Sequence, residues 1–125
     1  MTASWSQDEL RLVNAATELQ IAVERSDGSL GRWVPIWVVC ADGQVYVRTW
    51  YRRETGWFGR ALRSRQARIR MPGLEADVTV ADVGDTSPQV TADVDAAYRA
   101  KYGGGGAGSM VTAAAAATTL RLNLR

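Results

Sequence analysis

Histidine is absent from this sequence of 125 residues, and cysteine and lysine each occur once, at Cys40 and Lys101. Without histidine there is no Ser-His-Asp or Cys-His nucleophile system and no imidazole base that titrates near neutral pH. A single cysteine excludes an intrachain disulfide and any zinc site built on paired thiolates. Cys40 lies in an apolar run, which predicts a buried, inert thiol. Any catalytic chemistry would therefore belong to a bound cofactor or to the substrate.

Long apolar runs are also missing. No run approaches the roughly 20 residues that span a bilayer, and the first residues, MTASWSQDEL, lack the layout of a signal peptide. No acidic loop resembles a calcium site, so we expect no metal centre. A hydrophobic content of 46% and a charged content of 22% are typical of a soluble globular protein. The sequence predicts one cytoplasmic domain over residues 1–125.

The charge is unevenly distributed along the chain. Between residues 44 and 73 there are eight arginines and one acid, Glu54, which gives this segment a local charge of +7. The remaining 7 basic and 12 acidic residues give the rest of the chain a charge of −5, so the formal net charge of +2 conceals a polarised molecule. This concentration of arginine indicates a binding site for an anion. About half of these arginines are expected only to solvate the surface or to pair with the acidic strand, as arginine is the default cation of the chain.

Hydrophobic periodicity predicts six strands and three short helices. The expected strands are 19–24, 33–40, 45–50, 67–71, 74–80 and 120–124, and the expected helices are 6–16, 57–65 and 93–102. Short connections, without long helices between successive strands, favour an antiparallel sheet over a parallel one. We predict a mostly β (α+β) fold, a small six-stranded antiparallel barrel with short peripheral helices. The alanine run 113–117 fits either a helix or small-residue packing.

Two features of the central segment bear on function. Asp42 and Gly43 suit a tight hairpin turn, after which Arg48 lies between Tyr46 and Trp50 on one face of the return strand. An arginine in this setting is expected at a rim or ligand surface, or in an exposed cation–π stack. The helix that follows has an apolar stripe with arginines opposite it, and Arg52 and Arg53 precede its N-terminus. Backbone N–H groups and full charges would converge there on a phosphate.

Seven motifs together resemble a bacterial family described as domain of unknown function 2255. They are PIWVV (35–39), YVR (46–48), GWFGRA (56–61), RIRMPG (68–73), AYRAKY (97–102), MV (110–111) and TLRL (119–122). The combination covers most of the chain. The family name implies no activity.

A broader resemblance is to the split-barrel flavoproteins related to pyridoxamine phosphate oxidase and to the deazaflavin-dependent nitroreductases. The shared order is a strand with proline and tryptophan, an Asp-Gly hairpin, a strand ending in Arg-Thr, and a basic helix. The resemblance implies a six-stranded split barrel, a homodimer, and FMN or a deazaflavin coenzyme bound by its phosphate. By position, the cofactor-binding residues would be Arg48, Thr49, Trp50, Arg53 and Arg60, with Trp37 packing against the ring.

Three functions are consistent with these sequence features. The first is an oxidoreductase that uses FMN or a deazaflavin coenzyme for hydride transfer to a small molecule. The second is a non-catalytic binding module for an anionic small molecule or a protein partner. The third, nucleic-acid binding, is supported by arginines interleaved with aromatic residues. It is disfavoured by the small net charge, the acidic strand 75–82 and the lack of a recognised motif.

Overall fold

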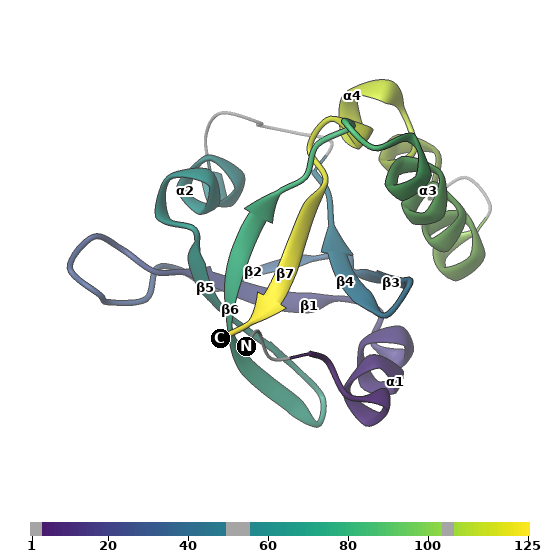
Figure 1. The fold of residues 1–125 in the computed structure, drawn as a ribbon. Coiled ribbons are helices and arrows are strands. Elements are labelled where there is room, and N and C mark those ends of the chain that lie inside the picture. Colours follow the sequence, from purple (N-terminus) through teal and green to yellow (C-terminus); the bar gives the residue numbers. More distant parts are fainter. Residues whose placement is uncertain (1–3, 50–55, 104–106) are drawn as a thin grey trace.

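The computed structural model describes residues 4–49, 56–103 and 107–125, which form seven strands, four α-helices and one 3₁₀-helix (Figure 1). In chain order they are α1 (Gln7–Ala15), β1 (Leu19–Val23), β2 (Val34–Ile36), β3 (Val39–Ala41), β4 (Gln44–Val47), α2 (Gly56–Ser64), β5 (Gln66–Met71), β6 (Leu74–Asp82), α3 (Pro88–Tyr102), η1 (Ala107–Met110), α4 (Ala113–Ala116) and β7 (Leu120–Leu124). In the described part of the chain, no helix is long and apolar enough to cross a membrane.

The seven strands form one antiparallel sheet in the order β2-β1-β5-β6-β7-β4-β3. Its two edge strands, β2 and β3, are separated in sequence only by Trp37 and Val38. Consecutive Cα atoms are about 3.8 Å apart, so the two edges must lie close together. A flat seven-stranded sheet could not satisfy this constraint. The sheet therefore curls into a half-barrel, which confirms the predicted mostly β architecture with short helices around it.

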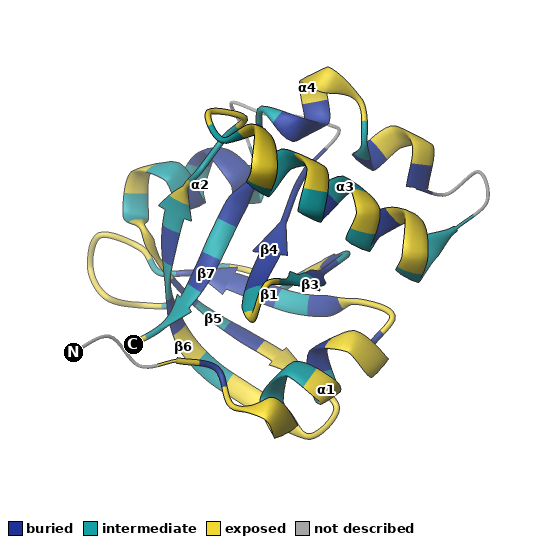
Figure 2. Ribbon diagram, turned by 45° about the vertical axis from the view of Figure 1, so that its right-hand side comes forward, coloured by how far each residue is buried: buried dark blue, intermediate teal, exposed yellow. Residues whose placement is uncertain are grey.

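Two hydrophobic clusters fill the space on the two sides of strand β4. Val45 and Val47 face the larger cluster inside the curled sheet, whereas Tyr46 faces a second cluster beneath α3. This follows from the alternation of side chains along a strand. The second cluster also includes Val94 and Tyr98 of α3, and Figure 2 shows this helix buried on its inner face and exposed on its outer one. Strand β4 is thus buried on both faces, unlike a strand at the rim of a barrel.

Local sequence signals set several boundaries as predicted. Ser6 accepts a hydrogen bond from the Glu9 backbone N–H, and the Glu9 carboxylate accepts one from the Ser6 N–H, a capping box that starts α1. Asp42 and Gly43 both have positive φ values, 50° and 72°, in the turn between β3 and β4. This geometry matches the twist of the hairpin strands.

The expected continuous strand 33–40 is wrong, because it is interrupted at Trp37 and Val38. The C-terminal end of α3 binds both backbone groups of Val38. Its N–H donates to the Tyr102 hydroxyl at 3.1 Å, and its carbonyl accepts from Lys101 Nζ at 2.7 Å. At Val38, side chains of α3 therefore make the backbone hydrogen bonds that a neighbouring strand would otherwise make. The interruption turns one predicted strand into β2 and β3, so the sheet has seven strands and not six.

The last predicted helix starts earlier than expected. The expected helix covers 93–102, but α3 already begins at Pro88, because Ser87 is its N-cap and accepts a hydrogen bond from the Val90 N–H. Proline is tolerated in the first turn because the N–H it lacks would have no partner there. The alanine run contributes a fourth helix, α4, which is capped by Thr112.

Removing the Tyr102 hydroxyl should destabilise the fold. This hydroxyl donates to the Thr17 carbonyl at 2.6 Å and accepts from the Val38 N–H. Tyr102→Phe leaves that N–H without its partner, and we expect a loss of about 1–3 kcal/mol in the free energy of unfolding. Urea denaturation measures this free energy. Tyr46→Phe, in the same cluster, is the control, and equal stability of the two variants would contradict the role assigned to Tyr102.

Candidate anion-binding groove

A groove lies between the loop that follows β1 and the second half of α2. These two segments are on the side of the molecule away from α3 and α4 (Figure 1). Its volume is about 800 Å³, within the usual range for small-molecule sites. The described lining residues come from two segments that are distant in sequence, 23–28 and 60–66. They are Val23, Glu24, Arg25, Ser26, Gly28, Arg60, Arg63, Ser64 and Gln66.

The amphipathic character of α2 places two arginines on the groove. Phe58 and Ala61 are buried in the main core, and Trp57 and Leu62 pack against it. The opposite face of α2 consequently carries Arg60 and Arg63, which are one turn apart and therefore neighbours on the helix surface. The apolar stripe and the outward arginines were predicted from the sequence, and the structure confirms them.

Positive charge dominates the groove. Arg25 lines the wall opposite α2 and is held by hydrogen bonds to Ser29 Oγ at 3.3 Å and to the Leu30 carbonyl at 2.9 Å. Within the described residues, neither Arg60 nor Arg63 has an ion-pair or hydrogen-bond partner for its side chain. Among the described lining residues the single acid, Glu24, is paired with Arg125 at 3.2 Å. In this described part of the lining, three arginine side chains accompany one paired carboxylate, an arrangement that suits an anion.

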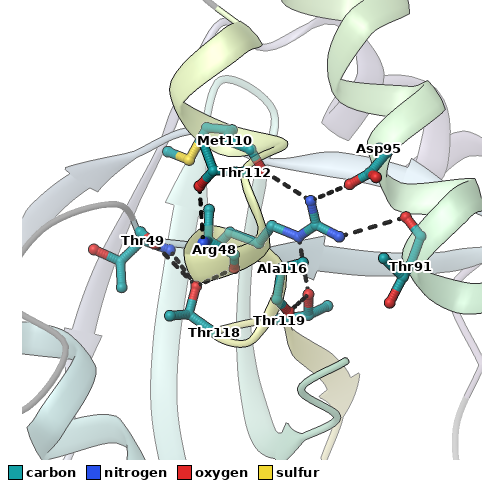
Figure 3. Close-up of polar contacts among 10 residues, drawn as sticks. Arg48, Thr49, Thr91, Asp95, Met110, Thr112, Ala116, Thr118 and Thr119 are labelled. Atoms are coloured by element: carbon teal, nitrogen blue, oxygen red, sulfur yellow. Dashed lines mark hydrogen bonds and ion pairs between the residues drawn. The ribbon is translucent and has the colours of Figure 1, made fainter. Parts of the chain in front are cut away.

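Arg48 has a different environment from the one predicted (Figure 3). The residue is 1% exposed and its side chain is completely buried. Its guanidinium donates from Nε to Thr119 Oγ1 at 2.9 Å, and from Nη1 to Asp95 Oδ1 at 2.5 Å and to the Met110 carbonyl at 2.8 Å. Nη2 approaches the Thr91 carbonyl at 3.5 Å. The expected rim position and the exposed cation–π stack are both wrong, since Arg48 connects β4 to α3, η1 and β7 in the interior.

Thr49 continues this internal network. The residue is 6% exposed, and its backbone N–H donates to Thr118 Oγ1 at 3.0 Å. The Thr118 hydroxyl also lies 3.0 Å from the Thr49 carbonyl. The chain is therefore fixed on both sides of Thr49 immediately before the segment that leads to α2.

Trp37 lies on the α3 side of the molecule. Its ring stacks on Tyr102 with the ring centroids 4.0 Å apart and the planes 3° from parallel.

Cys40 is only partly buried, but burial still raises the pKa of its thiol to about 11. A thiol with this pKa stays protonated at neutral pH and is a poor nucleophile.

The six predicted cofactor residues are thus not brought to one place. Arg48, Thr49 and Trp37 belong to the side of the molecule covered by α3 and α4, whereas Arg60 lines the groove beside α2. Trp50 and Arg53 fall in 50–55, outside the described residues. Sequence reasoning did not identify Arg25, which reaches the groove only because the loop after β1 folds against α2.

Other arginines follow the simpler expectation of surface pairing. Arg68 of β5 lies opposite Asp77 of β6, and its Nε donates to the carboxylate at 2.8 Å. This contact lowers the pKa of Asp77. Arg70 lies over the ring of Trp33 at 3.9 Å and bonds to Gln20. Both are surface interactions outside the groove.

Residues 9–122 match the family model described as "Uncharacterized protein conserved in bacteria (DUF2255)", so the chain belongs to this family. No curated protein matches the chain.

Solved structures show a similar fold at low sequence identity. The conserved hypothetical protein Rv2991 of Mycobacterium tuberculosis aligns with a TM-score of 0.65 at 12% identity, over 99% of this chain and 81% of Rv2991. A proposed 5-nitroimidazole antibiotic resistance protein of Bacteroides thetaiotaomicron gives 0.61 at 10% identity, over 99% and 81%. A NimC/NimA family protein of Clostridium acetobutylicum gives 0.56 at 14% identity, over 94% and 80%. These TM-scores show a common split-barrel fold.

Arg48→Lys should destabilise the protein. Lysine offers a single ammonium group and cannot reproduce the several directions in which the guanidinium donates. Removing one partner of a buried ion pair costs about 3–5 kcal/mol. Because lysine keeps the charge but leaves partners such as Thr119 unsatisfied, the free energy of unfolding should fall by somewhat less, about 2–4 kcal/mol. Chemical denaturation measures this loss. Unchanged stability together with lost cofactor binding would show instead that Arg48 is a ligand-binding residue.

Proposed function

We propose that this protein binds FMN or a deazaflavin coenzyme, with the coenzyme phosphate in the arginine groove, and that it acts as an oxidoreductase on a small molecule. The observation that carries the proposal is the pair Arg60 and Arg63, which line a groove of about 800 Å³ opposite Arg25. Arginine binds phosphate through charge-assisted, often bidentate hydrogen bonds. The predicted Arg53 belongs to the same proposal, since it precedes α2 in the sequence.

The groove fits the two ends of such a coenzyme unequally. Its three arginines suit the phosphate, but among the lining residues only Val23 is apolar, so the described walls offer little surface to an aromatic ring. The ring would therefore extend out of the groove. A second copy of the chain would supply the missing apolar wall, and the predicted homodimer is part of this proposal for that reason.

The bound coenzyme would supply hydride transfer, and the residues of the chain would bind and orient it. Arg60 and Arg63 would donate hydrogen bonds to the phosphate oxygens from α2, while Arg25 would do so from the loop. Arg25 is already oriented by Ser29 and the Leu30 carbonyl, so little side-chain freedom would be lost on binding. Imidazole chemistry plays no part, since the sequence has no histidine.

A non-catalytic module for an anionic small molecule is the second candidate. The polar lining of the groove favours it, because such a ligand would need no apolar wall. The same arginines would then bind the ligand without turnover. Binding of inorganic phosphate without any preference for FMN would favour this alternative.

Comparing FMN with riboflavin isolates the contribution of the phosphate. The visible spectrum of the purified protein would first show any coenzyme retained from the cell, and titrations with FMN, riboflavin and a deazaflavin coenzyme would follow. We expect FMN to bind at least tenfold more tightly than riboflavin. Arg60→Gln and Arg63→Gln should each weaken FMN binding by roughly tenfold or more, the usual contribution of a hydrogen bond to a charged group.

The riboflavin affinity of these variants should not change, because riboflavin lacks the phosphate. Arg99→Gln, an exposed arginine on α3, is the matched control and should bind FMN like the wild type. A protein that binds neither flavin nor deazaflavin, or one that binds FMN and riboflavin equally well, would contradict the proposal.

A further inference from the structure

We infer that Arg125 sets the affinity of the groove for its anion, although it does not itself line the groove. This inference rests on the proposed function, since it concerns the same phosphate. Arg125 would act as a positioning residue by neutralising Glu24, the one carboxylate among the described residues that line the groove. Without this partner, the carboxylate would repel a phosphate and compete for the arginines of the groove.

The contacts of Arg125 support this role. Its Nη1 lies 3.2 Å from Glu24 Oε2 and 2.9 Å from Gln66 Oε1, and both of these residues line the groove. Its Nη2 donates to the Ala67 carbonyl at 3.3 Å. The Arg125 backbone N–H donates to the Asp77 carbonyl at 3.1 Å, which fixes the residue beside β6. Arg125 thus contacts Glu24 from the sheet, and Arg125 itself does not line the groove.

A second carboxylate could compete for Arg125, but it has a closer partner of its own. Asp77 Oδ1 lies 3.6 Å from Arg125 Nη2 and 2.8 Å from Arg68 Nε. Because Arg68 satisfies Asp77, the shorter contacts of Arg125 go to Glu24 and Gln66. Four charges therefore form a chain, Arg68–Asp77–Arg125–Glu24, that begins on the outer face of the sheet and ends at the groove.

Removing Arg125 should reduce the affinity of the groove for its anion only moderately. The side chains of Arg125 and Glu24 are 28% and 25% exposed, so solvent partly screens their interaction. Exposing one negative charge within a Debye length of a bound phosphate should nevertheless weaken binding by about three- to tenfold. The effect should shrink at high salt, whereas the loss of a purely structural contact would not follow ionic strength in this way.

Arg125 could affect binding by neutralising Glu24 or only by bracing the strands. A double-mutant cycle of Arg125 and Glu24, with FMN as the probe, distinguishes these two roles. Arg125→Gln should raise the dissociation constant of FMN by about three- to tenfold at low salt and by less than twofold at about 0.5 M salt. Glu24→Gln should bind FMN at least as tightly as the wild type. The double variant Arg125→Gln/Glu24→Gln should match Glu24→Gln within about twofold, because no carboxylate then needs neutralising.

Riboflavin, which lacks the phosphate, should bind all three variants equally, and Arg121→Gln on β7, the strand that ends just before Arg125, is the control. If the wild type binds FMN through Arg60 but Arg125→Gln binds it equally well, this inference is overturned and the proposed function stands. Failure of Glu24→Gln to rescue FMN binding would likewise overturn it, in favour of strand bracing. A wild type that binds only the deazaflavin coenzyme is tested with the same variants and that coenzyme. If the wild type binds neither FMN nor the deazaflavin coenzyme, both the proposed function and the inference fail.

Discussion

A buried guanidinium group is the interaction on which the rest of this structure depends. Taking a charge out of water carries a large desolvation penalty, which only a close counter-charge and a full set of hydrogen bonds can offset. Arg48 has these partners in Asp95, Thr119 and the Met110 carbonyl. Because these groups come from α3, η1 and the residue before β7, the C-terminal third of the chain must pack against β4 in one particular way.

This constraint also affects the candidate site. Arg48 and Thr49 immediately precede the segment that leads to α2, and both are held by Thr119 and Thr118, the two residues before β7. The end of β4 is therefore anchored on the α3 side, while α2 and its arginines face the groove on the other side. The concentration of arginine in the sequence accordingly serves two purposes. One arginine organises the interior, and others remain on the surface, where an anion can reach them.

The fold was largely predictable, because its signals are local. The alternation of leucines at 120–124, the capping residues of α1 and the Asp-Gly turn each specify their element from a few neighbouring residues. The break at Val38 was not predictable, since it depends on Lys101 and Tyr102, more than 60 residues away. The start of α3 was missed for a different reason, because Ser87 and Pro88 suit a turn as well as the first residues of a helix.

The candidate site was only partly predictable. The helical stripe of α2 indicated correctly that Arg60 and Arg63 face away from the core. For Arg48, however, the same side-chain pattern fits a ligand surface and a buried ion pair, and only the packing of α3 over β4 distinguishes them. Asp95 gave no sign in the sequence that it would be the partner, since 47 residues separate the two. Arg25 was missed because a loop, which has no periodicity, brings it to the groove.

The central claim is that Arg48 is structural and that the anion binds beside α2. The most direct test is the NMR spectrum of the arginine Nε–H groups, assigned by single substitutions and recorded during an FMN titration. The Arg48 signal should exchange slowly with solvent and keep its position, because its Nε–H is buried against Thr119. The Arg60 and Arg63 signals should shift as FMN binds. A large shift of the Arg48 signal, with Arg60 and Arg63 unchanged, would contradict the account.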